Sequence, residues 1–391
     1  MKPPAIPQTR RQNLVAEPRN ILLLVSSMSG GGAERIAALL ANHWAAAGNH
    51  VTLLATYTVQ AESAYVLDSR VTLRHLASAT AMSRKGVRTQ LQRFKSLRRI
   101  IRELQPDNVV SFLTNVNVAA ILASWGTGVA PVVSERIHPA QFPISFTLAK
   151  LRILTYPRAA RVVVQTETTQ RWFATHVASA DTTVIANPVA WPLDSSAPVL
   201  LPDALVAQDD KLLLAVGRLD AQKGFADLIA AYTSLRGKLN GWKLVILGEG
   251  DQRVELEALI AAAGLAEQVL LPGWAGNIAD WYTRAELFVL SSHIEGFPNA
   301  LLEAMSYGVA CVSYDCATGP AEIIRDGIDG RLVALAAGAD GLAAAINELA
   351  EDEATRTRFA TQAVLVRQRF ALEKILLEWD RLLQATAQRP S

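Results

Sequence analysis

Residues 212–229 read LLLAVGRLDAQKGFADLI, and this order of residue types predicts how the second half of the chain folds. An apolar run predicts a buried strand, Gly217 and Arg218 predict a turn, and the periodic apolar residues after Lys223 predict a helix. A strand followed by a helix is the unit from which parallel sheets are built. Ligands bind such sheets at the carboxyl ends of the strands, which is where Arg218 and Lys223 fall.

The same alternation runs along the whole chain and predicts an α/β fold with parallel sheets. The expected strands of the first half are NILLLVSS, HVTLLAT, VTLRHL, NVVSFL, PVVSER and RVVVQT. Those of the second half are LLLAVG, WKLVILG, QVLLPG, LFVLSS, VACVSYD and GRLV.

A proline-rich segment, NPVAWPLDSSAPVLLPDA, separates the two halves and is typical of an interdomain linker. Residues 1–19 are rich in proline and polar residues, and we expect a disordered leader there. The domains expected from these features are 20–187, a linker at 188–205, 206–370, and an amphipathic C-terminal helix at 371–388.

The composition excludes several classes of protein. The 391 residues suffice for two domains, and a net charge of +2 argues against a general nucleic-acid-binding surface. The two cysteines, Cys311 and Cys316, are too few for a disulfide framework and are expected to be small buried side chains of a cytosolic protein. The sequence contains no run of eighteen apolar residues, so we expect no membrane-spanning helix.

Two glutamates eight positions apart, Glu295 and Glu303, lie in HIEGFPNALLEAMSYG (293–308). We expect Glu295 in a loop and Glu303 inside a helix that Pro298 opens and Gly308 closes. A helix N-terminus suits a phosphate, and nearby carboxylates suit sugar hydroxyls. Alone, such a pair is more often surface charge. Beside Arg218 and Lys223 it indicates a site for a sugar joined to a phosphate.

Four segments resemble glycosyltransferase family 4: SGGGAER, GRLDAQKG, LGEGDQR and EGFPNALLEAMSYG. The resemblance runs from about Asn20 to about Gln384. It implies the GT-B architecture, two Rossmann-like doubly wound lobes with the active site in the cleft between them. It also implies a nucleoside-diphosphate sugar as donor and transfer with retention of anomeric configuration. The segment DCATGPAEII resembles members that use UDP-sugars more than those that use GDP-mannose.

The resemblance implies a role for each motif residue. Arg218 and Lys223 would stabilise the departing diphosphate, Glu295 would face the donor sugar, and Glu303 would hold the ribose. No Asp-x-Asp in a suitable loop and no H-E-x-x-H is present, so we expect neither a metal nor another cofactor. The further donor contacts expected are Gly31, Gly32, Gly248, Trp274, Asn299, Ala300 and Leu301. For Trp274, a place in the hydrophobic core is an equally good interpretation.

Two features of the first half concern the acceptor. Glu135 and Arg136, in VVSERIHP, are a possible acceptor or sugar contact, although a salt bridge is as good an interpretation. The segment SRKGVRTQLQRFKSLRRIIREL (83–104) predicts an amphipathic helix with a cationic face. That face is either simply solvated or attracted to anionic lipid or a lipid-linked diphosphate. Its expected contact residues are Arg93, Lys95, Arg98 and Arg99, and a second basic cluster is Lys150, Arg152, Arg158 and Arg161.

We therefore expect a retaining transferase that moves a hexose or N-acetylhexosamine from a nucleoside-diphosphate sugar, with UDP favoured. The expected acceptor is a glycan on a polyprenyl diphosphate, met at the inner face of the cytoplasmic membrane during cell-surface polysaccharide or glycoconjugate synthesis. Three alternatives remain open: a soluble acceptor, a nucleotide-sugar epimerase, and a non-catalytic nucleotide-sugar-binding protein.

Overall fold

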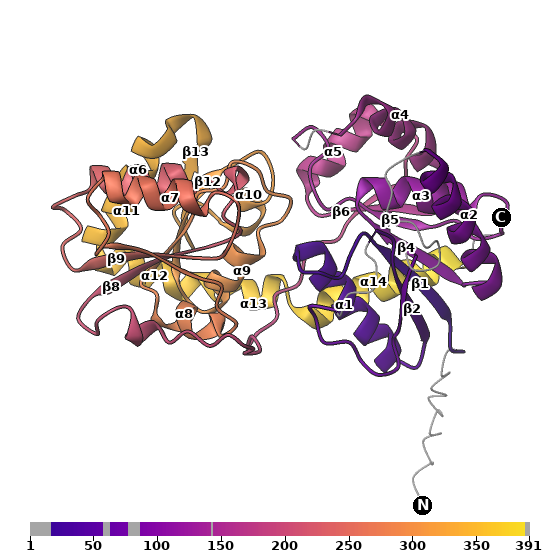
Figure 1. The fold of residues 1–391 in the computed structure, drawn as a ribbon, viewed down its shortest axis with the longest axis horizontal. Coiled ribbons are helices and arrows are strands. Elements are labelled where there is room, and N and C mark those ends of the chain that lie inside the picture. Colours follow the sequence, from indigo (N-terminus) through magenta and orange to yellow (C-terminus); the bar gives the residue numbers. More distant parts are fainter. Residues whose placement is uncertain (1–16, 58–62, 77–86, 142–143, 388–391) are drawn as a thin grey trace, which may run out of the picture.

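The computed structural model describes residues 17–57, 63–76, 87–141 and 144–387. They form two α/β lobes, each built around a parallel sheet (Figure 1). The α/β fold with two parallel sheets is thereby confirmed. The leader expected at residues 1–19 lies, except for its last three residues, outside the described residues.

The sheet of the N-terminal lobe has seven parallel strands in the order β3-β2-β1-β4-β5-β6-β7. The six predicted strands are present, and the short edge strand β7 was not predicted. The strands are β1 (Asn20–Val25), β2 (His50–Ala55), β3 (Thr72–His75), β4 (Asn108–Phe112), β5 (Val132–Ser134), β6 (Arg161–Val164) and β7 (Thr182–Val184).

Helices cover both faces of this sheet because the buried strands are apolar on both sides. In β1, Ile21 and Leu23 pack towards α1 and the C-terminal helix α14, whereas Leu22 and Leu24 pack towards α2 and α3. The helices are α1 (Gly32–Ala46), α2 (Val87–Leu104), α3 (Thr114–Ser124), α4 (Phe146–Thr155), α5 (Glu167–His176) and α14 (Leu372–Ala387).

The C-terminal lobe repeats this winding with six parallel strands in the order β10-β9-β8-β11-β12-β13. Its strands are β8 (Lys211–Val216), β9 (Trp242–Leu247), β10 (Val269–Gly273), β11 (Leu287–Leu290), β12 (Ala310–Asp315) and β13 (Arg331–Ala334). Its helices are α6 (Phe225–Ser234), α7 (Arg253–Ala262), α8 (Ile278–Arg284), α9 (Asn299–Ser306), α10 (Pro320–Ile323), α11 (Gly338–Glu351), α12 (Glu353–Ala363) and α13 (Val366–Arg369).

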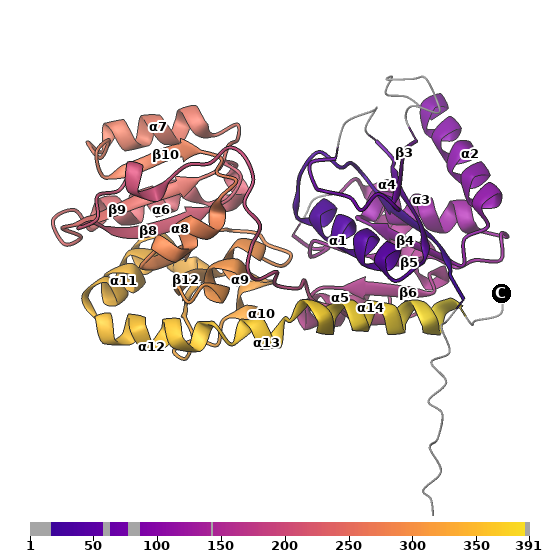
Figure 2. The ribbon, with the colours of Figure 1, turned by 90° about the horizontal axis from the view of Figure 1, so that it is seen from below.

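The last helix, α14, returns from the C-terminal lobe and runs beneath the N-terminal lobe (Figure 2). Trp379 is fully buried there, with its ring centroid 6.4 Å from that of Trp44 and 6.1 Å from that of Phe112. Asp380 accepts a hydrogen bond of 3.0 Å from the Trp44 indole. The end of the chain therefore completes the core of the lobe in which the chain begins.

Both sheets place their functional loops at the same kind of point. In each, the connections wind away in opposite directions from two central strands, β1 and β4 in one lobe and β8 and β11 in the other. The loops that follow such strands at their carboxyl ends form a crevice where ligands bind.

Cys311 and Cys316 are buried, as predicted. No helix in the described part of the chain is long and apolar enough to span a membrane.

Candidate active site

A cleft of about 700 Å³ lies between the two lobes, at the loops that follow the central strands of both sheets. It is lined by ten of the residues predicted for the site: Gly31, Gly32, Arg136, Arg218, Lys223, Gly248, Trp274, Glu295, Asn299 and Ala300. The sequence motifs, which are up to 269 positions apart (Gly31 to Ala300), thus converge on one cavity.

Lys223 and Glu295 form an ion pair at the centre of the C-terminal side of this cleft. The ammonium Nζ lies 2.6 Å from Oε1 of the carboxylate, and the side chains are only 19% and 8% exposed. Gly224 makes this approach possible, because it adopts a left-handed φ of +61° and a Cβ there would lie 2.1 Å from the Ser291 carbonyl oxygen. The loop after β8 can therefore lie directly against the loop after β11.

Arg218 stands at the open side of the cleft, with 73% of its side chain exposed. Its Nε lies 3.2 Å from Oδ2 of Asp220, which leaves the rest of the guanidinium free to turn towards a ligand. Gly248 packs behind it at φ +144°, and a Cβ on that residue would lie 1.8 Å from the Gly217 carbonyl oxygen. The glycine in LGEGDQR is thus required by the close contact of two loops.

The helix α9 brings its N-terminus to the cleft. Pro298 is the residue before the helix and not its first residue, so the predicted start is one position early. Asn299 and Ala300 line the cleft, whereas Leu301 is fully buried in the core of the lobe. The side chain of Leu301 can therefore only pack, and a contact with the donor would have to come from its backbone.

Glu303 lies one turn deeper in α9 and does not line the cleft. Its carboxylate forms an ion pair with Arg35 of α1, in the other lobe, and accepts a 3.2 Å hydrogen bond from the Tyr282 hydroxyl. The negative charge of Glu303 raises the pKa of Arg35. Arg35 belongs to the SGGGAER motif, but nothing in the sequence signals that it reaches a glutamate 268 positions away.

The glycine loop of the N-terminal lobe closes the cleft from the opposite side. The hydroxyl of Tyr65 accepts a hydrogen bond from the Gly31 amide at 2.9 Å and donates one to its carbonyl at 2.8 Å. A Cβ on Gly32 would lie 3.2 Å from Nδ2 of Asn299. The loop thus faces the N-terminus of α9, so a ligand at that terminus would touch both lobes.

Glu135 and Arg136 point in different directions. Glu135 is 3% exposed and lies inside the N-terminal lobe, where it accepts hydrogen bonds from Thr114 and from Tyr156. Burial raises the pKa of its carboxyl group despite these donors. Glu135 is not among the residues that line the cleft, and its hydrogen bonds come from hydroxyl groups and not from a cation.

Arg136 lines the cleft although it is only 7% exposed. It donates to the side-chain oxygen of Asn187 and stacks over Phe112, with its Cζ 4.8 Å from the ring centroid. Its Nε is buried and has no hydrogen-bond partner among the residues that the structure describes, and burial lowers the pKa of Arg136 to about 9. Asn187 also donates to Oδ1 of Asn299 at 2.8 Å and so links Arg136 to α9; sequence reasoning missed this asparagine.

Trp274 is 54% exposed at the edge of the cleft, which removes the interpretation of a core tryptophan. Gln165 and Glu249 also line the cleft and were not predicted. Gln165 directly follows β6, and Glu249, within LGEGDQR, lies two positions beyond the end of β9. That position at a strand's carboxyl end is the signal that could have identified them.

The cationic residues predicted on α2 lie away from the cleft. Lys95 and Arg99 are exposed, and Arg99 is 3.5 Å from Glu103. Arg98 donates to the carbonyl oxygens of Ala123 and Trp125 at 2.9 and 2.7 Å, and Arg93 lies over the Tyr57 ring at 5.2 Å. Two of the four cations therefore also serve the packing of α2 on its own lobe.

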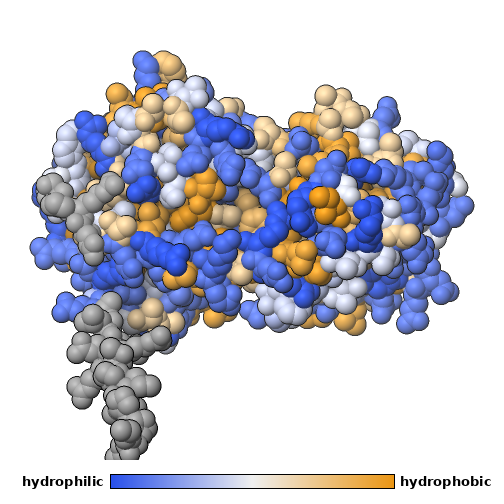
Figure 3. All heavy atoms as spheres, turned by 180° about the vertical axis from the view of Figure 1, so that it is seen from behind, coloured by the Kyte–Doolittle hydropathy of each residue, from blue (hydrophilic) through white to orange (hydrophobic). Residues whose placement is uncertain are grey.

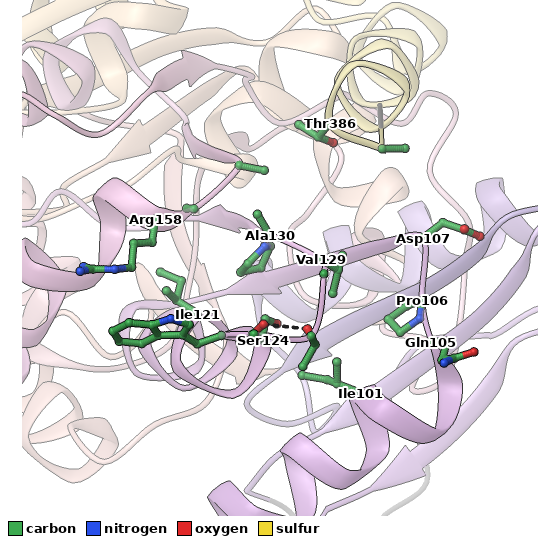
Figure 4. A pocket seen from close by; sticks show the side chains of 18 of the residues that line it. Ile101, Gln105, Pro106, Asp107, Ile121, Ser124, Val129, Ala130, Arg158 and Thr386 are labelled. Carbon is green, nitrogen blue, oxygen red and sulfur yellow. Dashed lines mark hydrogen bonds between the residues drawn. The ribbon is translucent and has the colours of Figure 1, made fainter. Parts of the chain in front are cut away.

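A second cavity, of about 800 Å³, lies at the opposite, amino ends of β4, β5 and β6 (Figure 4). Its lining includes Ile101, Pro106, Val129, Arg158 and Thr386. None of the four motifs contributes to it, and it lies away from the switch points of both sheets. We therefore assign the site to the cleft between the lobes.

Within the described residues, no group of three His, Cys, Asp or Glu side chains could hold a metal ion.

Two doubly wound lobes whose switch points face one shared cleft define the GT-B class of transferases. Two family models match the chain: Glycosyltransferase Family 4 over residues 30–190 and Glycosyl transferases group 1 over residues 201–365. The chain belongs to the family 4 type of glycosyltransferase and is a transferase enzyme, which sets the epimerase alternative aside.

Named relatives agree with this assignment. The amylovoran biosynthesis glycosyltransferase AmsD of Erwinia amylovora is 27% identical over 93% of this chain and 99% of its own length. A Campylobacter jejuni α-1,4-N-acetyl-D-galactosaminyltransferase, named for a diNAcBac-PP-undecaprenol-linked acceptor, is 26% identical over 93% of this chain and 98% of its own.

Solved structures show the same fold at low sequence identity. Sucrose-phosphate synthase from Thermosynechococcus elongatus superposes with a TM-score of 0.81 at 19% identity, over 94% of this chain and 98% of that one. The structure of Anabaena Alr3699/HepE, in complex with UDP and glucose, superposes with a TM-score of 0.74 at 19% identity, over 94% of this chain and 100% of that one.

Proposed function

We propose that this chain is a retaining glycosyltransferase that moves a hexose or N-acetylhexosamine from a UDP-sugar to a glycan carried on a polyprenyl diphosphate. The observation that carries the proposal is the Lys223–Glu295 pair, with Arg218 beside it, at the switch point of the C-terminal sheet. A cation next to a carboxylate at that point suits a phosphate next to a sugar.

In the proposed mechanism, the charge that develops on the leaving diphosphate is stabilised by Arg218, Lys223 and the backbone N–H groups at the start of α9. Glu295 accepts hydrogen bonds from the donor sugar, and Glu303 accepts them from the ribose. The departing phosphate takes the acceptor proton, so no protein nucleophile is required. The two cations do the work that a divalent metal does in other transferases, and we propose that the reaction needs no metal.

The proposed acceptor rests on the relatives and on charge. The Campylobacter transferase is named for an undecaprenyl-diphosphate acceptor. A lipid-linked acceptor requires the enzyme to work at a membrane, and we propose the inner face of the cytoplasmic membrane, with α2 contacting anionic lipid or the lipid diphosphate. A soluble sugar acceptor is the alternative, and it predicts no binding to vesicles.

The donor is tested by measuring the thermal stability and hydrolytic turnover of the protein with a panel of UDP- and GDP-sugars. One UDP-sugar should raise the melting temperature and be hydrolysed slowly, because a ligand that binds only the folded state stabilises it. Stabilisation by GDP-sugars alone would contradict the UDP assignment. Stabilisation without any turnover, even with lipid-linked acceptor, would instead point to a non-catalytic nucleotide-sugar-binding protein.

The α2 contact is tested with Lys95→Gln/Arg99→Gln, because both side chains are exposed. Arg98 is a poor choice, since its loss would free two carbonyl groups at the C-terminal end of α3. The double variant should bind phosphatidylglycerol vesicles more weakly than the native protein, by about thirtyfold for two cations near the surface. Equal binding would contradict the role of α2.

A further inference from the structure

Helix α4 turns apolar side chains outward, which is the reverse of what a helix covering a sheet normally does. Phe146, Ile153 and Leu154 are 74%, 45% and 63% exposed, and they occupy positions i, i+7 and i+8 of one helical stripe. Lys150, at i+4, is exposed on the same stripe. Arg152 lies on the inner side and is only 4% exposed.

A tryptophan from the neighbouring helix extends this apolar surface. Trp125 follows α3 and is 60% exposed. Arg158 lies over its ring, with Cζ 4.9 Å from the centroid, and donates a 2.8 Å hydrogen bond to the carbonyl oxygen of Leu154. Figure 4 shows Arg158 among the side chains that line the second cavity. Seen from behind, hydrophobic residues gather at the top of this lobe, the edge at which Figure 1 places α4 (Figure 3).

Each exposed aromatic residue of this surface is paired with a cation. Lys150 lies over the Phe146 ring, with Nζ 4.4 Å from the centroid, as Arg158 lies over Trp125. Exposed aromatic rings flanked by long basic side chains suit the boundary between lipid headgroups and acyl chains. There the apolar body of each side chain can be buried while its cation remains at the level of the phosphates.

The charge around α4 has one sign. Residues 69–166 contain fifteen Lys and Arg and three Asp and Glu, a net charge of +12 in a chain whose total is +2. Two of the fifteen, Arg70 and Arg161, form ion pairs with Asp68 and Asp181 outside this range, and the others still leave a large excess of positive charge. From Ser124 to Thr166 the only acidic residue is Glu135, and it is buried. The basic helix α2 belongs to the same layer, because α3 packs against both α2 and α4. This face therefore attracts an anionic surface and repels a second copy of itself.

We propose that α4 and Trp125 form a membrane-insertion surface for an anionic bilayer, with Phe146, Ile153 and Leu154 entering the acyl boundary. This inference rests on the proposed function, and it adds how the enzyme binds the membrane in which its acceptor lies. In this arrangement, α2 supplies long-range attraction and α4 supplies apolar contact. Interfacial helices bind by this combination of charge and buried apolar area.

The test is flotation of the full chain with phosphatidylcholine vesicles, with and without phosphatidylglycerol, for the native protein and for Phe146→Ser/Leu154→Ser. The native protein should float only with anionic vesicles. The double variant should bind at least about tenfold more weakly, since burying one such side chain contributes about that factor. Val254→Ser is the matched control, because Val254 is 77% exposed on the other lobe, and its binding should be unchanged.

Hydrolysis of the soluble donor separates this proposal from the proposed function, because the substituted side chains lie outside the cleft. Both variants should hydrolyse donor at the native rate. If Phe146→Ser/Leu154→Ser binds anionic vesicles as strongly as the native protein does, the insertion surface is overturned, even though the transferase is active. Absence of native binding, together with a dimer that Phe146→Ser/Leu154→Ser dissociates, would also overturn it and identify the face as a contact between copies.

Discussion

Arg35 and Glu303 form an ion pair that joins the N-terminal lobe to the C-terminal lobe beside the cleft. The second oxygen of Glu303 accepts a hydrogen bond from Tyr282, so both carboxylate oxygens are occupied. Glu303 is the residue to which we assign the ribose. Under that assignment Arg35 competes with the nucleotide, and binding of the donor has to release one contact between the lobes.

Glu303→Gln should therefore weaken UDP binding by about tenfold or more, because hydrogen bonds to a charged group contribute about 1.5–3 kcal/mol. Arg35→Met should leave UDP affinity unchanged or increase it, since it removes the competitor. Titration calorimetry with UDP measures both. A loss in Arg35→Met as large as that in Glu303→Gln would show that Arg35 itself contacts the nucleotide and would contradict this assignment.

Gly224→Ala should inactivate the enzyme and lower its stability. The new Cβ would lie 2.1 Å from the Ser291 carbonyl oxygen, and the shift needed to relieve this would move Lys223 away from Glu295. Gly237→Ala is the matched control, because Gly237 also has positive φ, at +84°, but open space around it. The control should cost only about 1–2 kcal/mol of backbone strain and retain activity. Thermal melts and turnover of both variants distinguish the two effects.

Glu135→Gln should make the protein more stable at neutral and alkaline pH. Burial raises the pKa of Glu135 in the folded state above its unfolded value, so the folded state favours the protonated form. Its contribution to stability is then fully present below the unfolded pKa and is lost as the pH rises through the folded pKa. The melting temperatures of the variant and the native protein should converge in acid and separate as the pH rises through the folded-state pKa of Glu135. A variant that is less stable at every pH would contradict this.

The sequence predicted the strands well because buried parallel strands are continuous apolar runs followed by glycine-rich turns. It missed β7, whose residues Thr182–Val184 form a three-residue, half-buried edge strand without an apolar run. The cleft residues after β8 and β11 were predicted for a topological reason, since both loops follow central strands of one sheet.

Contacts between the lobes could not be predicted in the same way. The Arg35–Glu303 pair and the Asn187–Asn299 hydrogen bond depend on how two separate domains meet, and no periodicity encodes that. The inward direction of Glu135 is a similar case. Glu135 and Arg136 are adjacent at the end of one strand, and neighbouring side chains there point to opposite sides. Residue type alone did not decide which of the two faces the cleft.

Treatment with EDTA should leave turnover unchanged, because the proposed diphosphate clamp consists of Arg218, Lys223 and the start of α9. The assay compares rates in buffer treated with chelator and in buffer supplemented with Mg²⁺ or Mn²⁺. Loss of activity in chelator that either ion restores would show that a metal takes part in the reaction.

The role of Arg218 and Lys223 in stabilising the leaving diphosphate can be measured through the turnover of Arg218→Ala and Lys223→Ala with the preferred UDP-sugar. Arg218 is largely exposed, so its loss should not disturb the fold, and Lys238→Ala provides an exposed cation of the same lobe as control. We expect kcat to fall about a hundredfold or more in both cleft variants, assayed where both are folded, with an unchanged control. Arg218→Ala should melt like the native protein, whereas Lys223→Ala should melt lower because it leaves Glu295, which is only 8% exposed, without its ion-pair partner. Near-native kcat in both cleft variants would contradict this role.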